Sequence, residues 1–166
     1  MHEAYGGYLC RVNEQTLEGL LAGYGARIHI PVHWGEMDAL GHVNNTVYLR
    51  YLESTRIRFC EELDYPGFDP AQMGSAAAPY GPILAQITCR YKFPVTYPDT
   101  LVAGTRYKTG SLHTYGFELE HILVSMRHLR IAAASVAGIV VYNYTELRKA
   151  EVPELLRKKL LAMENA

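Results

Sequence analysis

The sequence predicts one domain of the α+β class, in which an antiparallel sheet of about five strands wraps around one long central helix. Its 166 residues are enough for a single hydrophobic core. Apolar side chains recur at helical spacing between residues 46 and 63, and from residue 83 onwards they mostly alternate with polar ones, as in strands. A sheet with one apolar face and one long helix to cover it favours this two-layer arrangement.

The first strand is predicted over "RIHIPVHW", residues 27–34, where β-branched residues alternate with polar ones. Pro31 has no backbone N–H, so we expect this strand at an edge of the sheet. A weakly amphipathic segment, 15–21, precedes it. We treat residues 1–27 as an N-terminal extension of unassigned role and residues 28–150 as the main domain.

The central helix is predicted over residues 46–63. One side of it is mainly apolar, and the other carries Arg50, Arg58, Glu61 and Glu62. Asn44 or Asn45 is the expected N-cap, because a short side-chain oxygen can accept a free N–H of the first turn. The helix should end before Pro66 and Gly67, where a loop rich in glycine, alanine and proline begins.

Four further strands are expected after this loop, over residues 83–93, 100–110, 114–126 and 131–144. Their connections are too short for parallel crossovers, so the strands should be antiparallel and form a meander. The final segment, 151–166, is predicted to contain a short amphipathic helix with Pro153 near its first position.

The charge composition argues against two classes of partner. The chain has 16 Lys and Arg against 17 Asp and Glu, and its basic residues are scattered. We therefore expect neither nucleic acid nor an acidic membrane surface as a partner. The most apolar run, residues 131–142, is too short to cross a bilayer.

Cysteine and histidine spacing argues against a metal site and against disulfides. The three cysteines are odd in number and lack a CxxC spacing, which favours free thiols in a reducing compartment. The chain start also lacks the pattern of a secretory signal, so a cytoplasmic location is expected. His29 and His33 lie four residues apart on a strand, about 13 Å, which is too far to share an ion.

The stretch "WGEMDALGHVNN", residues 34–45, places an acid, a glycine and two asparagines ahead of the helix. Free N–H groups and the helix dipole at a helix N-terminus can stabilise a developing oxyanion. The Asp38 carboxylate could then attack an activated acyl group or activate water. The same residues are also typical of simple helix capping, and the pattern by itself leaves both interpretations open.

The longer stretch "EMDALGHVNNTVYLRYLESTR" resembles the signature of hotdog-fold acyl-CoA thioesterases of the 4-hydroxybenzoyl-CoA thioesterase type. In that family a first strand leads to an Asp, then HVNN, then a helix with an aromatic residue and a Glu-x-x-Arg end. "YKFPVTYPDTLVAGTRY" is similar to the next strand pair. The resemblance covers about residues 27–145. The matching positions here are Asp38, His42, Val43, Asn44, Asn45, Tyr48, Tyr51, Glu53 and Arg56.

The resemblance implies a catalytic centre around the start of the helix. Asp38 would be the nucleophile or general base, and backbone N–H groups from Val43 to Asn45 would polarise the thioester carbonyl. His42 would orient Asp38 or a water, although loop packing explains it equally well. No metal or redox cofactor is implied, and coenzyme A enters as part of the substrate.

The resemblance also implies a homodimer with the two sheets joined edge to edge and active sites at the interface, often doubled into a tetramer. Many relatives of the smaller-acyl branch have Tyr and His where this chain has Trp34 and Asn45. The HVNN form is more similar to the fatty-acyl branch, so we expect a medium or long acyl chain.

Substrate-binding residues are predicted in two groups. Trp34, Tyr48 and Tyr51 could line the acyl pocket, although aromatic residues at such positions are also typical of the core. Arg90, Lys92, Arg106 and Lys108 are candidates for the coenzyme A phosphates. The resemblance suggests that His113 and Thr114 lie close to the pantetheine or nucleotide. Each of these could instead be an ordinary solvated residue.

Three rival interpretations remain at this stage. Glu53 on the helix could be the catalytic carboxylate, although its i, i+3 spacing to Arg56 is more typical of an ion pair. The chain could be a hotdog dehydratase or hydratase, but these need a catalytic His in a different motif. It could also be a non-catalytic acyl-CoA sensor, which would bind ligand without turnover.

Overall fold

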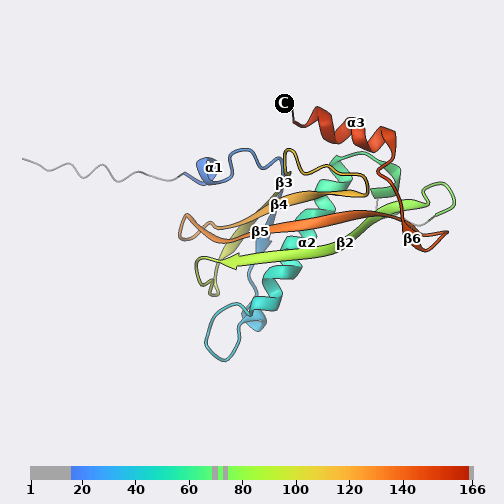
Figure 1. The fold of residues 1–166 in the computed structure, drawn as a ribbon. Helices are drawn as coiled ribbons and strands as arrows, with labels where there is room; N and C mark the ends of the chain where they lie inside the picture. Colours follow the sequence, from blue (N-terminus) through green and yellow to red (C-terminus); the bar gives the residue numbers. More distant parts are fainter. Residues whose placement is uncertain (1–15, 69–70, 73–74, 165–166) are drawn as a thin grey trace, which may run out of the picture.

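The computed structural model describes residues 16–68, 71–72 and 75–164, and shows a curled antiparallel sheet whose concave face holds one long helix (Figure 1). This confirms the predicted fold class. The elements in chain order are α1 (Leu17–Leu20), β1 (Ala26–Pro31), η1 (Trp34–Glu36), α2 (Asn45–Glu62), η2 (Pro66–Phe68), β2 (Tyr80–Tyr91), β3 (Thr100–Tyr107), β4 (Gly116–Ser125), β5 (Arg130–Asn143), β6 (Arg148–Lys149) and α3 (Glu154–Ala162).

The strands are antiparallel and lie in the order β1-β3-β4-β5-β2, with the short β6 added beside β5. The position of β1 at an edge agrees with the expectation from Pro31. The predicted meander is wrong for β2, which pairs with β5 at the far edge and not with β3. The chain from Tyr91 to Thr100 can reach about 30 Å when extended, while crossing three strand spacings takes only about 14 Å. A connection as short as the one from β2 to β3 can therefore join two strands that are not neighbours in the sheet.

Helix α2 is anchored to the sheet by its apolar stripe. Its N-cap is Asn44, whose side-chain Oδ1 accepts the Thr46 N–H at 3.0 Å. Leu52 is completely buried near the middle of the helix, and Phe59 and Leu63 continue the buried side toward its C-terminal end. The helix packs mainly against β1, β3 and β4, so the β5 and β2 side of the concave face receives much less cover from it.

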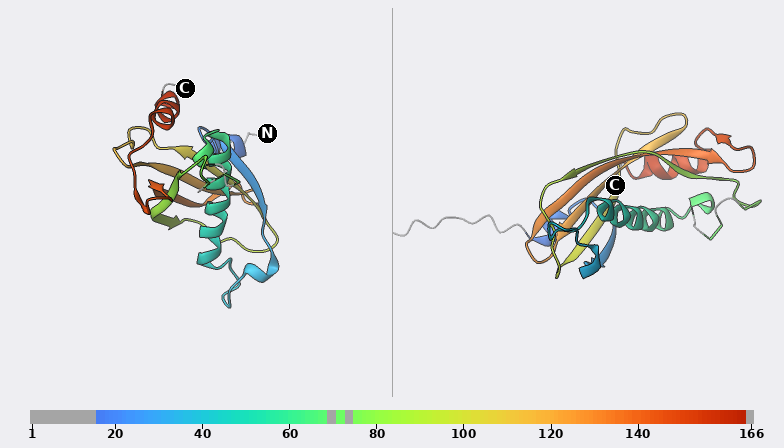
Figure 2. Two further views of the ribbon diagram at one scale, coloured as in Figure 1. Left: turned by 90° about the vertical axis from the view of Figure 1, so that its right-hand side faces the viewer. Right: turned by 90° about the horizontal axis from the view of Figure 1, so that it is seen from below.

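The segment ahead of β1 packs on the outer face of the sheet, on the side away from α2 (Figure 2). Leu21 is buried there against outward-facing residues of β3 and β4. Arg27 fixes the segment by donating to the Leu21 carbonyl at 2.8 Å and the Tyr24 carbonyl at 2.6 Å. Residues 17–24, which the sequence left without a role, thus cover part of this face. Residues 1–15 of the predicted extension lie outside the described residues.

Among the described helices, none has the length and apolarity that crossing a membrane requires.

Candidate active site

The loop that joins β1 to α2 is closed by backbone hydrogen bonds around Asp38. The Asp38 N–H donates to the His42 carbonyl at 2.8 Å, and the Gly41 N–H donates to the Asp38 carbonyl at 3.0 Å. Gly41 has a φ of 75°, a conformation that side-chain-bearing residues rarely adopt. The turn that presents Asp38 therefore depends on a glycine at this position.

Glu36 anchors the same loop to the helix, a role that the sequence interpretation missed. Its Oε2 accepts the Tyr51 hydroxyl at 2.5 Å and the His33 N–H at 2.8 Å, while its carbonyl accepts the Asn44 N–H at 2.9 Å. The pKa of Tyr51 is raised mainly by burial and also by the Glu36 carboxylate. Its hydroxyl therefore stays protonated and can act as the donor. The three-residue spacing from His33 to Glu36, a capping-box pattern, was the available signal.

The backbone donors at the start of α2 are not equivalent. The Val43 N–H donates to the Val95 carbonyl at 2.8 Å, and the Asn44 N–H is used by Glu36. The Thr46 N–H is capped by Asn44. Among the described residues, nothing accepts the Asn45 N–H. The predicted set of donors from Val43 to Asn45 is therefore reduced to Asn45, because the other two already bind within the protein.

A cavity of about 380 Å³ opens at this point, lined by Asp38, His42, Val43, Asn45, Tyr48, Tyr91, Lys92, Phe93 and Pro94. The Asp38 carboxylate is half-buried, and its Oδ1 accepts the Leu40 N–H at 2.8 Å. No described residue donates to its Oδ2. The exposed His42 imidazole forms no hydrogen bond within the described chain either. Two residues that line the cavity thus carry a group without a partner in the described chain: the Oδ2 of Asp38 and the N–H of Asn45.

Two tyrosines fix the wall of this cavity. Tyr91, at the end of β2, donates its hydroxyl to the Asn45 carbonyl at 3.1 Å. Tyr48 accepts the Val95 N–H at 3.2 Å, and the two rings meet edge to face with centroids 5.1 Å apart. Burial raises the pKa of Tyr48, which keeps it neutral. Tyr48 was predicted to line a pocket here. Tyr91 was missed, although its inward position in the strand alternation was visible.

Several predicted substrate residues lie away from this cavity. Trp34 is 73% exposed and does not line it. The Tyr51 hydroxyl donates to Glu36, and Tyr51 does not line this cavity. Arg90 alternates with Tyr91 on β2, so its side chain lies on the opposite face of the sheet. Lys92 is the predicted cation that does line the cavity.

The turn carrying His113 and Thr114 joins β3 to β4 at the opposite end of the sheet. Asp38 follows β1, whose last residue pairs with Thr100 at the start of β3. The eight residues of β3 separate the two regions by about 23 Å. One chain alone does not bring this turn to Asp38.

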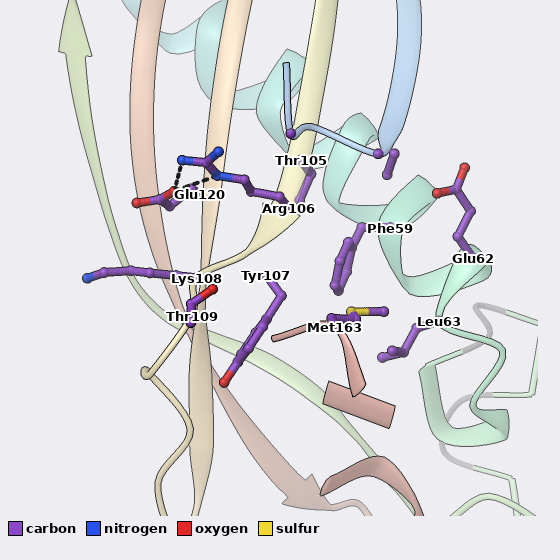
Figure 3. Close-up of a pocket in the computed structure, with 13 residues that line it drawn as sticks. Phe59, Glu62, Leu63, Thr105, Arg106, Tyr107, Lys108, Thr109, Glu120 and Met163 are labelled. Carbon is purple, nitrogen blue, oxygen red and sulfur yellow. Dashed lines mark hydrogen bonds and ion pairs between the residues drawn. The ribbon is translucent and has the colours of Figure 1, made fainter. Parts of the chain in front are cut away.

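A larger hollow of about 740 Å³ lies at the other end of α2 (Figure 3). Phe59, Leu63 and Met163 form an apolar part of its lining. Its charged residues are already paired: Arg106 with Glu120 at 2.7 Å, Lys108 with Glu118, and Glu62 with Arg58 at 2.8 Å. Arg106 and Lys108, predicted for coenzyme A phosphates, therefore lie in this hollow and not at the Asp38 cavity.

The rival carboxylate Glu53 is exposed on α2, 3.6 Å from Arg56, and does not line the Asp38 cavity. Within the described ranges, no three His, Cys, Asp or Glu side chains are placed to hold a metal ion. The absence of a metal cofactor stays a prediction.

Residues 32–160 match the Thioesterase-like superfamily. The chain belongs to this superfamily. It is therefore a thioester hydrolase, as the resemblance around Asp38 suggested. No curated protein matches the sequence.

Two solved thioesterase structures illustrate the similarity. The PA2801 protein of Pseudomonas aeruginosa, provisionally assigned as a thioesterase, is 34% identical, with 80% of this chain and 95% of that chain covered and a TM-score of 0.66. A thioesterase from Thermus thermophilus, solved with coenzyme A and Zn, is 26% identical, with 87% and 98% covered and a TM-score of 0.71. The curled sheet around α2 is thus the thioesterase hotdog fold.

Proposed function

We propose that this thioesterase hydrolyses acyl-CoA thioesters in the cavity between Asp38 and the start of α2. The observation that carries the proposal is the pair of unused groups there, the Asp38 Oδ2 and the Asn45 N–H, which belong to residues lining one cavity. A carboxylate and a helix N-terminal donor are the two groups that thioester hydrolysis needs. The coenzyme A complex of the Thermus relative supports a coenzyme A thioester as substrate.

In the proposed reaction the thioester carbonyl oxygen accepts the Asn45 N–H, where the positive end of the α2 dipole favours negative charge. The Asp38 carboxylate then either attacks the carbonyl carbon or takes a proton from an attacking water. The tetrahedral intermediate collapses with cleavage of the C–S bond, and the coenzyme A thiolate leaves and is protonated. If Asp38 attacks, water hydrolyses the resulting acyl-aspartyl anhydride and restores the carboxylate.

We further propose a medium or long acyl chain, supported by the HVNN form of the motif. Tyr48 and Tyr91 supply aromatic wall to the cavity, and Lys92 supplies a cation at its edge. That cation would attract the coenzyme A phosphates. The predicted residues His113 and Thr114 lie far from this cavity within one chain, so they could contact the substrate only from a second chain.

A homodimer joined through β2 is part of the proposal. β2 pairs with β5 on one side, and over its twelve residues no described strand covers the other side. Tyr80, Leu84 and Tyr91 are exposed on it, and a long uncovered strand of this kind normally finds a partner. Antiparallel pairing of two β2 strands would bring the Tyr80 end of one chain, with its His113–Thr114 turn, to the Asp38 cavity of the other.

A cytoplasmic location is proposed on the state of the thiols. The described cysteines, Cys60 and Cys89, are both free. Burial raises the pKa of Cys60 to about 12, so it is an unreactive core thiol. Free thiols of this kind suit a reducing compartment.

The test is release of free thiol from a panel of acyl-CoAs of increasing chain length, including aromatic acyl groups. Asp38→Asn should lower kcat by at least about 100-fold without changing the circular dichroism spectrum. Glu53→Gln, which removes the charge of the rival carboxylate, should keep the turnover of acyl-CoAs that carry no hydroxyl on the acyl chain. Full activity of Asp38→Asn would remove Asp38 from the mechanism, and loss of turnover in Glu53→Gln alongside it would assign the reaction to Glu53. Binding of acyl-CoA by wild type without thiol release would identify a sensor instead.

A further inference from the structure

A row of polar side chains crosses the inner face of the sheet beneath the middle of α2. Thr105 of β3 pairs with His121 of β4, His121 pairs with Ser135 of β5, and Ser135 pairs with Cys89 of β2. Directly paired residues on neighbouring strands share one face of a sheet. The Thr105 hydroxyl bonds to Thr55 of α2 at 3.2 Å, so that face is the one turned to the helix. We call Thr105, His121, Ser135 and Cys89 the polar row.

Three buried polar atoms at this row lack a hydrogen-bond partner within the described chain: Arg56 Nη1, His121 Nε2 and Ser135 Oγ. Their residues are 9%, 1% and 6% exposed. Arg56 lies on α2 close enough to His121 for its charge to affect the imidazole. Leaving one buried polar group unpaired is costly, so three in one place indicate a missing binding partner.

The hydrogen-bond chain around His121 identifies what that partner must offer. Thr55 donates its hydroxyl proton to the Ala103 carbonyl at 3.4 Å, and Thr105 donates its own to Thr55. Because Thr105 uses its proton for Thr55, we assign the imidazole the tautomer that donates from His121 Nδ1 to the Thr105 oxygen, 2.7 Å away. His121 Nε2 is therefore unprotonated and needs a donor. Burial, and then the charge of Arg56, lower the pKa of His121 to about 3, which keeps the imidazole neutral.

A bound group could donate to His121 Nε2 and accept from Arg56 Nη1, while the Ser135 hydroxyl can do either. A hydroxyl oxygen satisfies these requirements. A carboxylate has no proton to donate, and an alkyl group satisfies none of them. The chemistry at this point is matched to one O–H group.

The more exposed end of the polar row lies near the proposed active site. Burial decreases along it from Thr105 and His121, through Ser135, to Cys89, which is partly exposed. Tyr91 lies two residues beyond Cys89 on the same face of β2, and its hydroxyl contacts the Asn45 carbonyl. Tyr91 and Ser135 are about 8 Å apart in the plane of the sheet, given two residues along a strand and one strand across.

We propose that the polar row, with Arg56, binds a hydroxyl group at the far end of the acyl chain and makes the enzyme selective for medium-length hydroxyacyl thioesters. The inference rests on the proposed function, because the acyl group reaches the row from the Asp38 cavity. The separation of about 8 Å between Tyr91 and Ser135 places the hydroxyl several carbon atoms from the thioester carbonyl, not beside it.

The test compares pairs of acyl-CoAs of equal length that differ only in a terminal hydroxyl. Wild type should prefer the hydroxylated member of the best pair by about tenfold in kcat/KM. Ser135→Ala should reduce that preference about fivefold and leave the unsubstituted member unchanged. Ser54→Ala, which removes a hydroxyl from the exposed side of α2, is the matched control and should keep the full preference. Thermal unfolding of each variant checks its fold.

Equal kcat/KM for both members at every length in wild type would overturn the inference, and the row would then hold only a buried water. An equal effect of Ser135→Ala on both members would also overturn it. If wild type cleaves no thioester, the proposed function fails separately. Binding of hydrolysis-resistant thioether analogues then decides the inference, with tighter binding of the hydroxylated analogue supporting it and equal binding overturning it.

Discussion

The two ends of α2 differ in the size of their cavities and in how many of the polar groups there are already bonded within the protein. At the C-terminal end the cavity measures about 740 Å³, yet its charged side chains are neutralised by neighbours. At the N-terminal end the cavity measures only about 380 Å³, yet a carboxylate oxygen and a helix N–H there have no partner in the described chain. Size alone would select the C-terminal end, whereas the unpaired groups favour the N-terminal end.

The difference shows that unused hydrogen-bonding groups are a better guide to chemistry than volume. A protein satisfies most of its buried and half-buried polar groups, so those it leaves free at a cavity are available to a ligand. At the N-terminal end the loop from β1 uses the Val43 and Asn44 donors for its own structure. Of the three donors from Val43 to Asn45, the one on Asn45 has no acceptor in the described chain.

The largest effect is expected from loosening the loop at the N-terminal end. Glu36→Gln replaces the charged acceptor of the Tyr51 hydroxyl and the His33 N–H. We expect a free energy of unfolding lower by about 2 to 3 kcal/mol and kcat/KM lower by about tenfold, because Asp38 is less firmly held. Chemical denaturation and thiol release measure the two effects. Glu61→Gln, exposed on the same helix, should change neither, and equal losses in both variants would contradict the role of Glu36.

A smaller effect concerns His121, beneath the middle of the helix. Its folded pKa of about 3 lies below the ordinary value of 6.5, so between these values the unfolded chain binds a proton that the folded chain does not. Its contribution to stability is complete above pH 6.5 and is lost as the pH falls. From pH 7 to pH 5 wild type should lose about 2 kcal/mol of unfolding free energy through this group. His121→Gln should show a much flatter profile in denaturant titrations at the two pH values.

The smallest effect is expected at the C-terminal end. Tyr107→Phe removes the hydroxyl that donates to Glu164 Oε1 at 2.8 Å beside the larger hollow. The free energy of unfolding should fall by about 1 kcal/mol, while kcat and KM for acyl-CoA stay unchanged. A clear loss of turnover in this variant, with its fold intact, would mean that the larger hollow takes part in the reaction.

The sequence predicted most of the fold because its periodicities are strong. The span of α2 and the five long strands agree with their predicted positions to within a few residues, since one face of each must be apolar. The neighbour of β2 was not predictable in the same way. The chain after Tyr91 is long enough to reach either a near or a far strand, and side-chain alternation does not record which one it pairs with.

The sequence predicted which residues of the candidate site lie together better than it predicted which backbone donors are free. The acid, the glycine turn and the helix start are local features, and the structure places Asp38, His42 and Asn45 along one cavity. The hydrogen bond from the Val43 N–H to the Val95 carbonyl, by contrast, joins residues far apart in sequence. The placement of Tyr51 and Arg90 away from this cavity was not predictable for the same reason, since their partners and faces are set by tertiary packing.

The most direct test of the account is to remove the Asn45 N–H while leaving the helix intact. Asn45→Pro does this at the first position of α2, where proline is well tolerated, and Asn44 already has the extended φ and ψ of −59° and 141° that precede a proline. Asn45→Ala keeps the N–H and is the matched control. We predict a kcat for thiol release about 100-fold lower in Asn45→Pro and nearly unchanged in Asn45→Ala. Equal turnover in the two folded variants would contradict the assignment of this helix end as the oxyanion site.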